Sequence, residues 1–353
     1  MRKRNFLTAK CRLCIIVITA TVLLTLGLEG PVAAQQRFEI DISTLPAGFA
    51  SYIMGVAMAE QINKNSTWLH ATAMEGRGPA EHMKTLVTKP EKRKNYLFFN
   101  TPWDVWEANH GWGAYKNFPF NYDEFKFVCI LGVAGNGLCT LDPNIKSLRD
   151  LVGKRVILDS AAGKSRQLTY TGILKEMGIP LDKIKYQYST GKMSADTLRD
   201  GLVDVIYTGH VLKKLPNVWA NSPFQAELVA TKKVYFISFD LDSVKTYKAK
   251  TGHPLGVVMV PSKMLSPQQT EPCGILIKPL GFCAHISMPD HVVAEILRVV
   301  YENAHKFKEY NPIGEIIAKE TLASLSIPEE AYHPTAVKFF KEKGIEITGF
   351  DVR

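Results

Sequence analysis

The pattern of apolar and polar residues predicts strands and helices in alternation along most of the chain. Apolar and polar residues alternate over 38–42, which is typical of a strand, and apolar residues recur at helical spacing over 52–62. Further strands are expected over 68–73, 95–99, 155–158, 184–188, 202–207, 233–239 and 274–286, and helices over 165–177, 194–199, 289–308, 312–324 and 334–343, with another beginning at Pro79. This alternation predicts an α/β fold with a largely parallel sheet.

Two local features refine this expectation in the middle of the chain. Apolar strands over 126–133 and 138–141 are separated by a segment whose Asn136-Gly137 pair suits a tight reversal. The strand over 202–207 is expected to end before a loop at Thr208-Gly209-His210. No Pro- or Ser-rich linker divides the chain, which favours strand-like crossings between its parts.

The first 34 residues have the features of a secretory signal peptide. A basic start precedes an apolar run over 14–28, and Val32 and Ala34 are small residues placed for cleavage after Ala34. An apolar run this short favours a cleaved leader over an anchor, which stays the alternative. We therefore expect a soluble, exported protein that begins at residue 35.

Removal of this leader changes the reading of the charge. The leader carries five basic residues and one acid, so the net charge falls from +9 to +5. The remaining Lys and Arg are dispersed, which argues against nucleic acid as a partner. With 46% hydrophobic residues the chain is too apolar to be disordered, and 353 residues favour two domains.

Cysteine and histidine give no metal signature. The four cysteines after the leader, at 129, 139, 273 and 283, permit disulfides in an oxidising compartment, with buried free thiols as the alternative. None has the spacing of a zinc site, and the nine His form no recognisable metal motif. We expect no cofactor and no metal.

Three motifs give the chain a family resemblance. Residues 142–156 (DPNIKSLRDLVGKRV) are similar to the stretch I-K-S-L-x-D-L-x-G-K-R-V of the TAXI-type solute-binding subunits of TRAP transporters. Residues 196–204 resemble their A-L-x-x-G-x-I-D, and residues 332–344 (YHPTAVKFFKEKG) their L-H-P-G-A-x-x-Y-Y-K-E-K-G. The resemblance spans nearly the whole chain after the leader.

Two glycine-rich segments of that family are altered here. The family's G-T-G-G-T-Y-Y-P-x-G corresponds to residues 43–55, where most of the glycines are replaced. Its A-T-G-G-S corresponds to Ala73-Met74-Glu75-Gly76-Arg77-Gly78. The ligand of glutamate-binding relatives is therefore not carried over to this chain.

The resemblance implies a two-lobed periplasmic-binding-protein-like fold with lobes joined by crossing hinge strands. Residues 35–139 and 274–353 would form one lobe and residues 140–273 the other. Such a protein captures a small organic anion between its lobes in the periplasm and delivers it to the TRAP membrane subunits. The alternatives are a periplasmic binding protein that serves an ABC permease or a sensor, and an exported enzyme on the same scaffold.

The loops that follow the predicted strands supply the candidate ligand residues, because ligands of open α/β sheets lie beyond the carboxyl ends of strands. These candidates are Ser43, Thr44, Gly76, Arg77, Gly78, Asn100, Thr101, Trp103, Ser160, Lys164, Ser165, Tyr207, Thr208 and Gly209. Arg77 lies between two glycines, where a guanidinium can approach an anion closely, and it is predicted to be the anion clamp.

Two other interpretations of these segments are excluded or disfavoured. The Gly163-Lys164-Ser165 triplet suggests a phosphate loop, but the required earlier glycine is replaced by Leu158. No nucleophile elbow or Cys/His constellation appears in the sequence, so we expect binding without catalysis.

Overall fold

The computed structural model describes residues 37–47, 49–160, 165–323 and 327–347. The strands are β1 (Phe38–Ser43), β2 (Leu69–Met74), β3 (Tyr96–Asn100), β4 (Phe125–Thr140), β5 (Arg155–Asp159), β6 (Lys185–Tyr188), β7 (Val205–Lys214), β8 (Val218–Asn221), β9 (Tyr235–Ile237), β10 (Gly256–Val260) and β11 (Cys273–His285). The α-helices are α2 (Ala50–Asn65), α3 (Pro79–Thr88), α4 (Pro102–Asn109), α5 (Ser165–Glu176), α6 (Gly191–Arg199), α7 (Pro223–Thr231), α8 (Leu241–Thr251), α9 (Asp290–Glu302) and α10 (Pro334–Glu342). The predicted leader lies outside the described residues.

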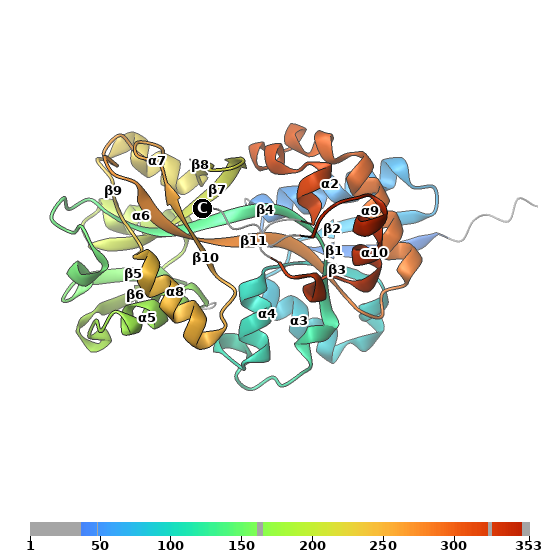
Figure 1. Ribbon diagram of the computed structural model, residues 1–353, viewed down its shortest axis with the longest axis horizontal. Helices are drawn as coiled ribbons and strands as arrows, with labels where there is room; N and C mark the ends of the chain where they lie inside the picture. The colour runs from blue at the N-terminus through green and yellow to red at the C-terminus, as the bar shows by residue number, and fades with distance from the viewer. Residues whose placement is uncertain (1–36, 48, 161–164, 324–326, 348–353) are drawn as a thin grey trace, which may run out of the picture. The chain divides into compact units, whose positions relative to one another are not determined.

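Two long antiparallel strands, β4 and β11, connect two parallel groups in one sheet. The strand order is β2-β1-β3-β11-β4-β7-β5-β6, with β1 parallel to β3 and β5 parallel to both β6 and β7. Strand β11 pairs with β3 on one side and β4 on the other, and β4 also pairs with β7. Figure 1 shows β4 and β11 running side by side between the two groups. The predicted α/β fold with crossing strands is confirmed.

The lobe boundaries expected from the sequence fall at the ends of these connecting strands. The boundary at 139/140 lies at the end of β4, and the boundary at 273/274 lies at the start of β11. The assignment of individual residues to two lobes stays a prediction.

The reversal predicted at Asn136-Gly137 is wrong, because β4 is a single strand through this point. Asn136 lies opposite Leu276 of β11 on one side and opposite Gly209 of β7 on the other. The backbone is therefore paired on both sides, which satisfies its polar groups without a turn. A Cβ on Gly137 would lie 2.9 Å from the Thr208 Oγ1, so the glycine serves close packing here.

The loop predicted at Thr208-Gly209-His210 is also wrong, because β7 continues to Lys214. Thr208 and Gly209 lie opposite Gly137 and Asn136 of β4. His210 is 1% exposed, and its ring contacts the hydroxyl of Thr208 and the side-chain oxygen of Asn221. Pairing with β4 and β8 keeps β7 extended beyond residue 207, where the local sequence predicted that the strand would end.

The C-terminal helices are predicted in the right places, but parts of them are short 3-10 turns. Helix α9 is followed by a 3-10 turn over Ala304–Glu309, and the helix expected over 312–324 consists of 3-10 turns at Pro312–Ile316 and Lys319–Leu322. Helix α10 begins at Pro334, with the His333 side chain accepting a hydrogen bond from the Thr335 backbone N–H.

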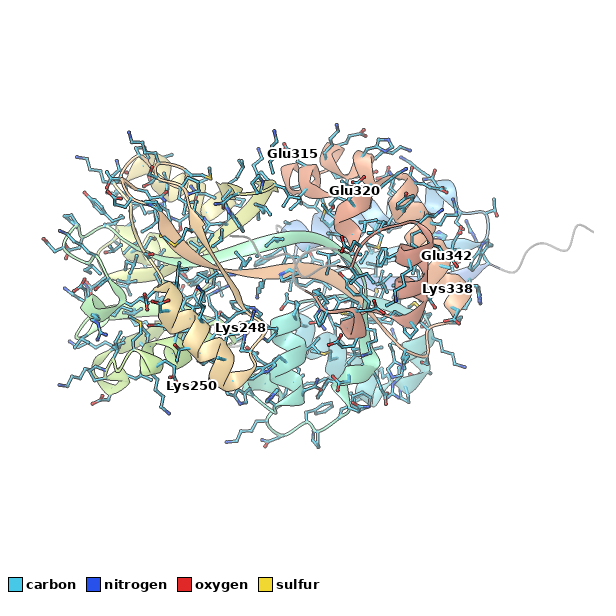
Figure 2. The ribbon with its side chains drawn as sticks, viewed as in Figure 1. Lys248, Lys250, Glu315, Glu320, Lys338 and Glu342 are labelled. Carbon is cyan, nitrogen blue, oxygen red and sulfur yellow. The ribbon has the colours of Figure 1, made fainter. Side chains whose placement is uncertain are left out.

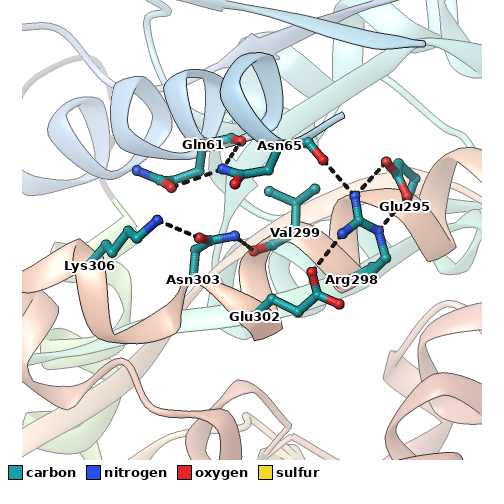
Figure 3. Close-up of polar contacts among 8 residues, drawn as sticks. All are labelled: Gln61, Asn65, Glu295, Arg298, Val299, Glu302, Asn303 and Lys306. Carbon is teal, nitrogen blue, oxygen red and sulfur yellow. Dashed lines mark hydrogen bonds and ion pairs between the residues drawn. The ribbon is translucent and has the colours of Figure 1, made fainter. Parts of the chain in front are cut away.

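A polar contact network fastens α9 to the end of α2 (Figure 3). Arg298 on α9 donates to the Asn65 carbonyl at 2.7 Å and forms ion pairs with Glu295 and Glu302. The guanidinium thereby satisfies a carbonyl at the C-terminal end of α2, where an intrahelical donor is missing.

The edge strand β2 is covered by a side chain of α2. The Asn63 amide donates to the Ala71 carbonyl at 2.9 Å, and its oxygen accepts from the Ala71 N–H at 2.8 Å. These bonds occupy backbone groups that an edge strand otherwise presents to other chains.

The four described cysteines are buried and free, so the structure pairs none of them. Burial raises the pKa of Cys129, Cys139 and Cys273 to about 12. For the protein that begins at residue 35, we expect a thiol reagent such as Ellman's reagent to leave the native state unmodified and to titrate all four thiols after unfolding. Fast labelling of the native protein, or fewer than four thiols after unfolding without reductant, would contradict this arrangement.

Among the described residues, no helix is long and apolar enough to cross a membrane.

Candidate functional site

The centre of the connecting strands carries polar side chains on one face. Lys278 of β11 lies opposite Ala134 of β4, two residues from Asn136. Because alternate residues of a strand share a face, Asn136 and Lys278 project to the same side of the sheet. Tyr207 of β7 lies opposite Leu138 and therefore shares that side as well.

Two helices and the end of a strand bring further charges to this face. Asp104 and Glu107 belong to α4, Arg166 to the first turn of α5, and Asp159 is the last residue of β5. Electrostatic interactions join Lys278 to Asp104, Glu107, Asp159 and Arg166. We call this set the central cluster: Asp104, Glu107, Asn136, Asp159, Arg166 and Lys278.

Arg166 is held in a defined orientation. Its Nε donates to the Asn136 Oδ1 at 3.2 Å, and its Nη1 lies 3.3 Å from the Asp159 Oδ1. The guanidinium carbon lies 4.1 Å from the centre of the Tyr207 ring. The side chain of Arg166 therefore contacts Asn136, Asp159 and Tyr207 at once, which fixes the direction in which its guanidinium points.

Asn136 has a buried amide nitrogen without a partner. The residue is 4% exposed, and its Nδ2 makes no hydrogen bond within the described part of the chain. Since the Arg166 Nε can only donate, the Asn136 atom that faces it is the oxygen, and the Nδ2 points elsewhere. A buried donor left unsatisfied is costly, so it marks a place for an acceptor.

Lys278 is a charged residue that lies among the apolar residues of β11. Its Nζ lies 5.0 Å from the centre of the Trp103 ring and forms no ion pair within 4.0 Å with a described acid. Burial lowers the pKa of Lys278, which the surrounding acids oppose. The Trp103 beneath it also has a buried indole N–H without an acceptor in the described residues.

The pKa values of the two carboxyl groups of α4 are raised. Burial, and then the neighbouring Asp104, raise the pKa of Glu107 to about 8. Burial likewise raises the pKa of Asp104, against the opposing effect of Lys278. The Glu107 Oε1 accepts a hydrogen bond from the Ser165 hydroxyl of α5 at 2.6 Å.

Several of the predicted ligand residues border the central cluster, among them Trp103, whose ring centre lies 5.0 Å from the Lys278 Nζ. Thr101 caps α4 and donates its hydroxyl to the Asp104 carboxylate at 2.5 Å. Ser165 holds Glu107, and Tyr207 lies against Arg166.

A second group of predicted residues packs at the ends of β1 and β2. Ser43 and Thr44 are buried, and a Cβ added to Gly76 would lie 2.8 Å from the Ser43 Oγ and 2.6 Å from the Thr44 carbonyl oxygen. It would also lie 2.2 Å from the Nε2 of His82, whose burial lowers its pKa to about 4. In the described chain these residues make no hydrogen bond with the central cluster.

The predicted anion clamp Arg77 lies at the surface. Its side chain is 86% exposed, and its Nε is 3.8 Å from the Glu81 Oε2. The adjoining Gly78 has a φ of 126° and precedes α3, a conformation that favours glycine. The structure therefore does not bring Arg77 to the central cluster.

The remaining predicted residues have varied surroundings. Asn100 is fully buried and accepts from the Thr101 N–H, and Trp103 is 0% exposed within the apolar core. The Ser160 N–H donates to the Asp159 carboxylate, and Lys164 lies outside the described residues. Thr208 and Gly209 lie within β7, as described above.

Unlike the central cluster, several charged side chains of α8 and α10 are exposed. The labelled Lys248, Lys250, Lys338 and Glu342 lie on α8 and α10 (Figure 2), and Lys338 and Glu342 form an i,i+4 pair at 4.0 Å. Such exposed pairs contribute little to stability. In the part of the chain that the structure describes, no three His, Cys, Asp or Glu are placed to hold a metal ion.

Comparison of the sequence with known families gives one assignment. Residues 42–344 match the NMT1-like family. The chain belongs to the NMT1-like family. No curated protein sequence matches this NMT1-like protein significantly.

Solved structures similar to this NMT1-like protein include periplasmic sulfonate-binding proteins and a protein with bound malate. A periplasmic sulfonate-binding protein, SsuA, from Methylobacillus flagellatus KT has 13% identity and a TM-score of 0.49, covering 90% of this chain and 91% of its own. MatC from Rhodopseudomonas palustris with bound malate has 13% identity and a TM-score of 0.48, covering 89% and 97%. The aliphatic sulphonate binding protein SsuA from Escherichia coli has 12% identity and a TM-score of 0.44, covering 78% and 77%.

Sequence reasoning missed most of the central cluster of this NMT1-like protein. Lys278 carried a usable signal, because a single charge within the apolar run over 274–286 is expensive to bury without a purpose. Arg166 directly follows the predicted loop over 159–165. Asp104 and Glu107 carried no signal, since only the three-dimensional fold places them against Lys278.

Proposed function

We propose that this protein is an extracytoplasmic solute-binding protein that captures a small organic anion and delivers it to a membrane permease. Membership of the NMT1-like family, the α/β fold with connecting strands and the predicted leader support this proposal. The protein would bind its solute without changing it chemically.

We infer an anionic ligand from the hydrogen-bond donors of the central cluster. The central cluster contains the Asn136 Nδ2, the Arg166 guanidinium and the Lys278 ammonium, and the Asn136 Nδ2 has no acceptor in the described structure. These groups are all donors and two of them are cationic. A carboxylate or sulfonate supplies the acceptor oxygens that such a set requires.

The proposed ligand site therefore centres on Arg166, Asn136 and Lys278, bordered by Thr101, Ser165 and Tyr207. Arg166 takes the clamp role that the sequence suggested for Arg77. The other candidates stay predictions for the rest of the site: Ser43, Thr44, Gly76, Gly78, Asn100, Trp103, Ser160, Lys164, Thr208 and Gly209.

The type of permease is the finer part of the proposal. The motifs over 142–156, 196–204 and 332–344 favour the TAXI-type TRAP transporters and two lobes that close on the solute. An ABC permease or a sensor is the alternative partner. A neighbouring gene for a TRAP membrane subunit supports the first partner, and a neighbouring ABC permease gene supports the second.

A thermal-unfolding screen of carboxylates, sulfonates and amino acids tests the proposed function. A ligand at about one hundred times its dissociation constant adds roughly 2.7 kcal/mol to the free energy of unfolding, which raises Tm by several degrees. We expect this increase with an organic anion and none with its uncharged amide, for instance butyrate against butyramide. Stabilisation by the amide alone, or by organic cations alone, would contradict the anion site.

A further inference from the structure

The charges of the central cluster do not balance when every group is ionised. Arg166 and Lys278 carry two positive charges, whereas Asp104, Glu107 and Asp159 carry three negative charges. Arg166 and Asp159 form an ion pair at 3.3 Å and compensate each other. Lys278 is then left to compensate both Asp104 and Glu107, which stand one turn apart on α4.

Protonation of Glu107 would remove one of these three negative charges. The residue is 3% exposed, and its Oε1 is held by Ser165 across from α5. The other groups that face it are Asp104 on its own helix, Lys278 from β11 and Asp159 from β5. An added anion beside an ionised Glu107 would place further negative charge in a poorly solvated region.

Two buried tyrosines near Glu107 add no charge. The Tyr115 and Tyr247 hydroxyls have no hydrogen-bond partner among the described residues. Burial raises the pKa of Tyr247 to about 12 and raises the pKa of Tyr115 well above its usual value, so both stay neutral. His253, which packs against Trp103 and Tyr247, is also neutral, because burial lowers its pKa to about 3.

We propose that the site accepts an oxyanion with a single negative charge, a carboxylate or a sulfonate, and that Glu107 carries a proton when this anion is bound. With Glu107 neutral, the two cations and the two remaining acids cancel, so one anionic group bound against Arg166 and Asn136 leaves one uncompensated charge, whereas it would leave two if Glu107 were ionised. A second anionic group would leave two uncompensated charges. The inference rests on the proposed function and adds to it a ligand charge and a proton.

The pH dependence follows from linkage between the proton and the anion. Burial and Asp104 raise the pKa of Glu107 to about 8 before the ligand is added, and a bound anion raises it further. Anion affinity is therefore constant below pH 8 and falls by up to about tenfold per pH unit above it. The Ser165 hydrogen bond lowers the pKa of Glu107, so its removal should shift the fall in affinity to higher pH.

The test measures Tm of the purified protein with acetate, methanesulfonate and malonate between pH 6.5 and 9.5. We expect acetate or methanesulfonate to raise Tm at pH 7 and doubly charged malonate to raise it less. The dissociation constant should rise about tenfold between pH 8.5 and 9.5 for the wild type and stay constant for Glu107→Gln. Ser165→Ala should move the midpoint upward, and it supplies a second readout if Glu107→Gln does not fold.

A matched control is Glu271→Gln, which removes an exposed carboxylate before β11 and should keep the wild-type pH profile. A wild-type anion affinity that is constant from pH 6.5 to 9.5, or a fall that persists in Glu107→Gln, overturns the role of Glu107 and leaves the proposed function standing. Stronger stabilisation by malonate overturns the single-charge rule. No stabilisation by any of the three anions at any pH counts against the oxyanion site itself.

Discussion

Replacing Arg166 with glutamine is expected to weaken binding of the organic anion by at least about tenfold. A hydrogen bond to a charged group contributes about 1.5–3 kcal/mol, and 1.4 kcal/mol corresponds to a factor of ten in affinity. Glutamine removes the guanidinium proposed to meet the anion, together with its Nη1 contact with Asp159. Isothermal titration with the best anion from the thermal screen measures the change.

Two further variants test whether anion binding depends on the positive charge of residue 166, on its planar guanidinium group, or on Arg77 instead. Arg166→Lys keeps the positive charge but lacks the planar fork, so its affinity should fall between the wild type and Arg166→Gln. Arg77→Gln removes an exposed guanidinium beside Glu81 and should bind as the wild type does. Loss of binding in Arg77→Gln with normal binding in Arg166→Gln would return the clamp to the residue that the sequence suggested.

Truncation of Trp103 is expected to lower the stability of the protein strongly. This side chain is 0% exposed, belongs to the core that packs β5, α5 and β7, and lies under the Lys278 ammonium. Truncation of a buried tryptophan leaves a cavity and costs about 3–5 kcal/mol. We expect Trp103→Ala to lower Tm on the order of 10 °C in the absence of ligand.

Trp106 provides the matched comparison three residues later on the same helix. It is partly exposed and stacks on His110, with ring centres 3.9 Å apart, so Trp106→Ala should cost less than Trp103→Ala. Equal Tm values for the two variants would show that Trp103 is not the core residue that its burial indicates.

The periodicity of the sequence was sufficient for most individual elements. The helix expected over 52–62 and the strand expected over 68–73 are present as α2 and β2. The errors occur where long-range pairing overrides a local signal. An Asn-Gly pair suits a turn, but β7 and β11 both pair with β4 at Asn136, and this pairing keeps the strand extended.

The site was predicted less well than the fold, for a related reason. Thr101, Ser165 and Tyr207 lie near the ends of predicted strands and were found by that rule. Asn136 and Lys278 lie in the middle of long strands, and only the register of β4 with β11 shows that they share a face. The proximity of Glu107 to Ser165 joins helices 58 positions apart and leaves no trace in local sequence.

The pKa shifts at the site are consistent with a binding function built on burial. His82 and His210 have their pKa values lowered to about 4 by burial, so they are neutral at pH 7. Positive charge for an anion therefore comes from Arg166 and Lys278. We therefore assign anion recognition to the central cluster and a packing role to His82 and His210.

We propose that the protein binds a small organic anion and releases it unchanged. The most direct measurement follows the proton NMR spectrum of the best anion from the screen, incubated with stoichiometric wild-type protein or Arg166→Gln. We expect line broadening of the anion resonances with the wild type, little broadening with the variant, and full recovery of the unaltered anion after the protein is removed. New resonances that grow with time in the presence of the wild type would contradict it and identify an enzyme.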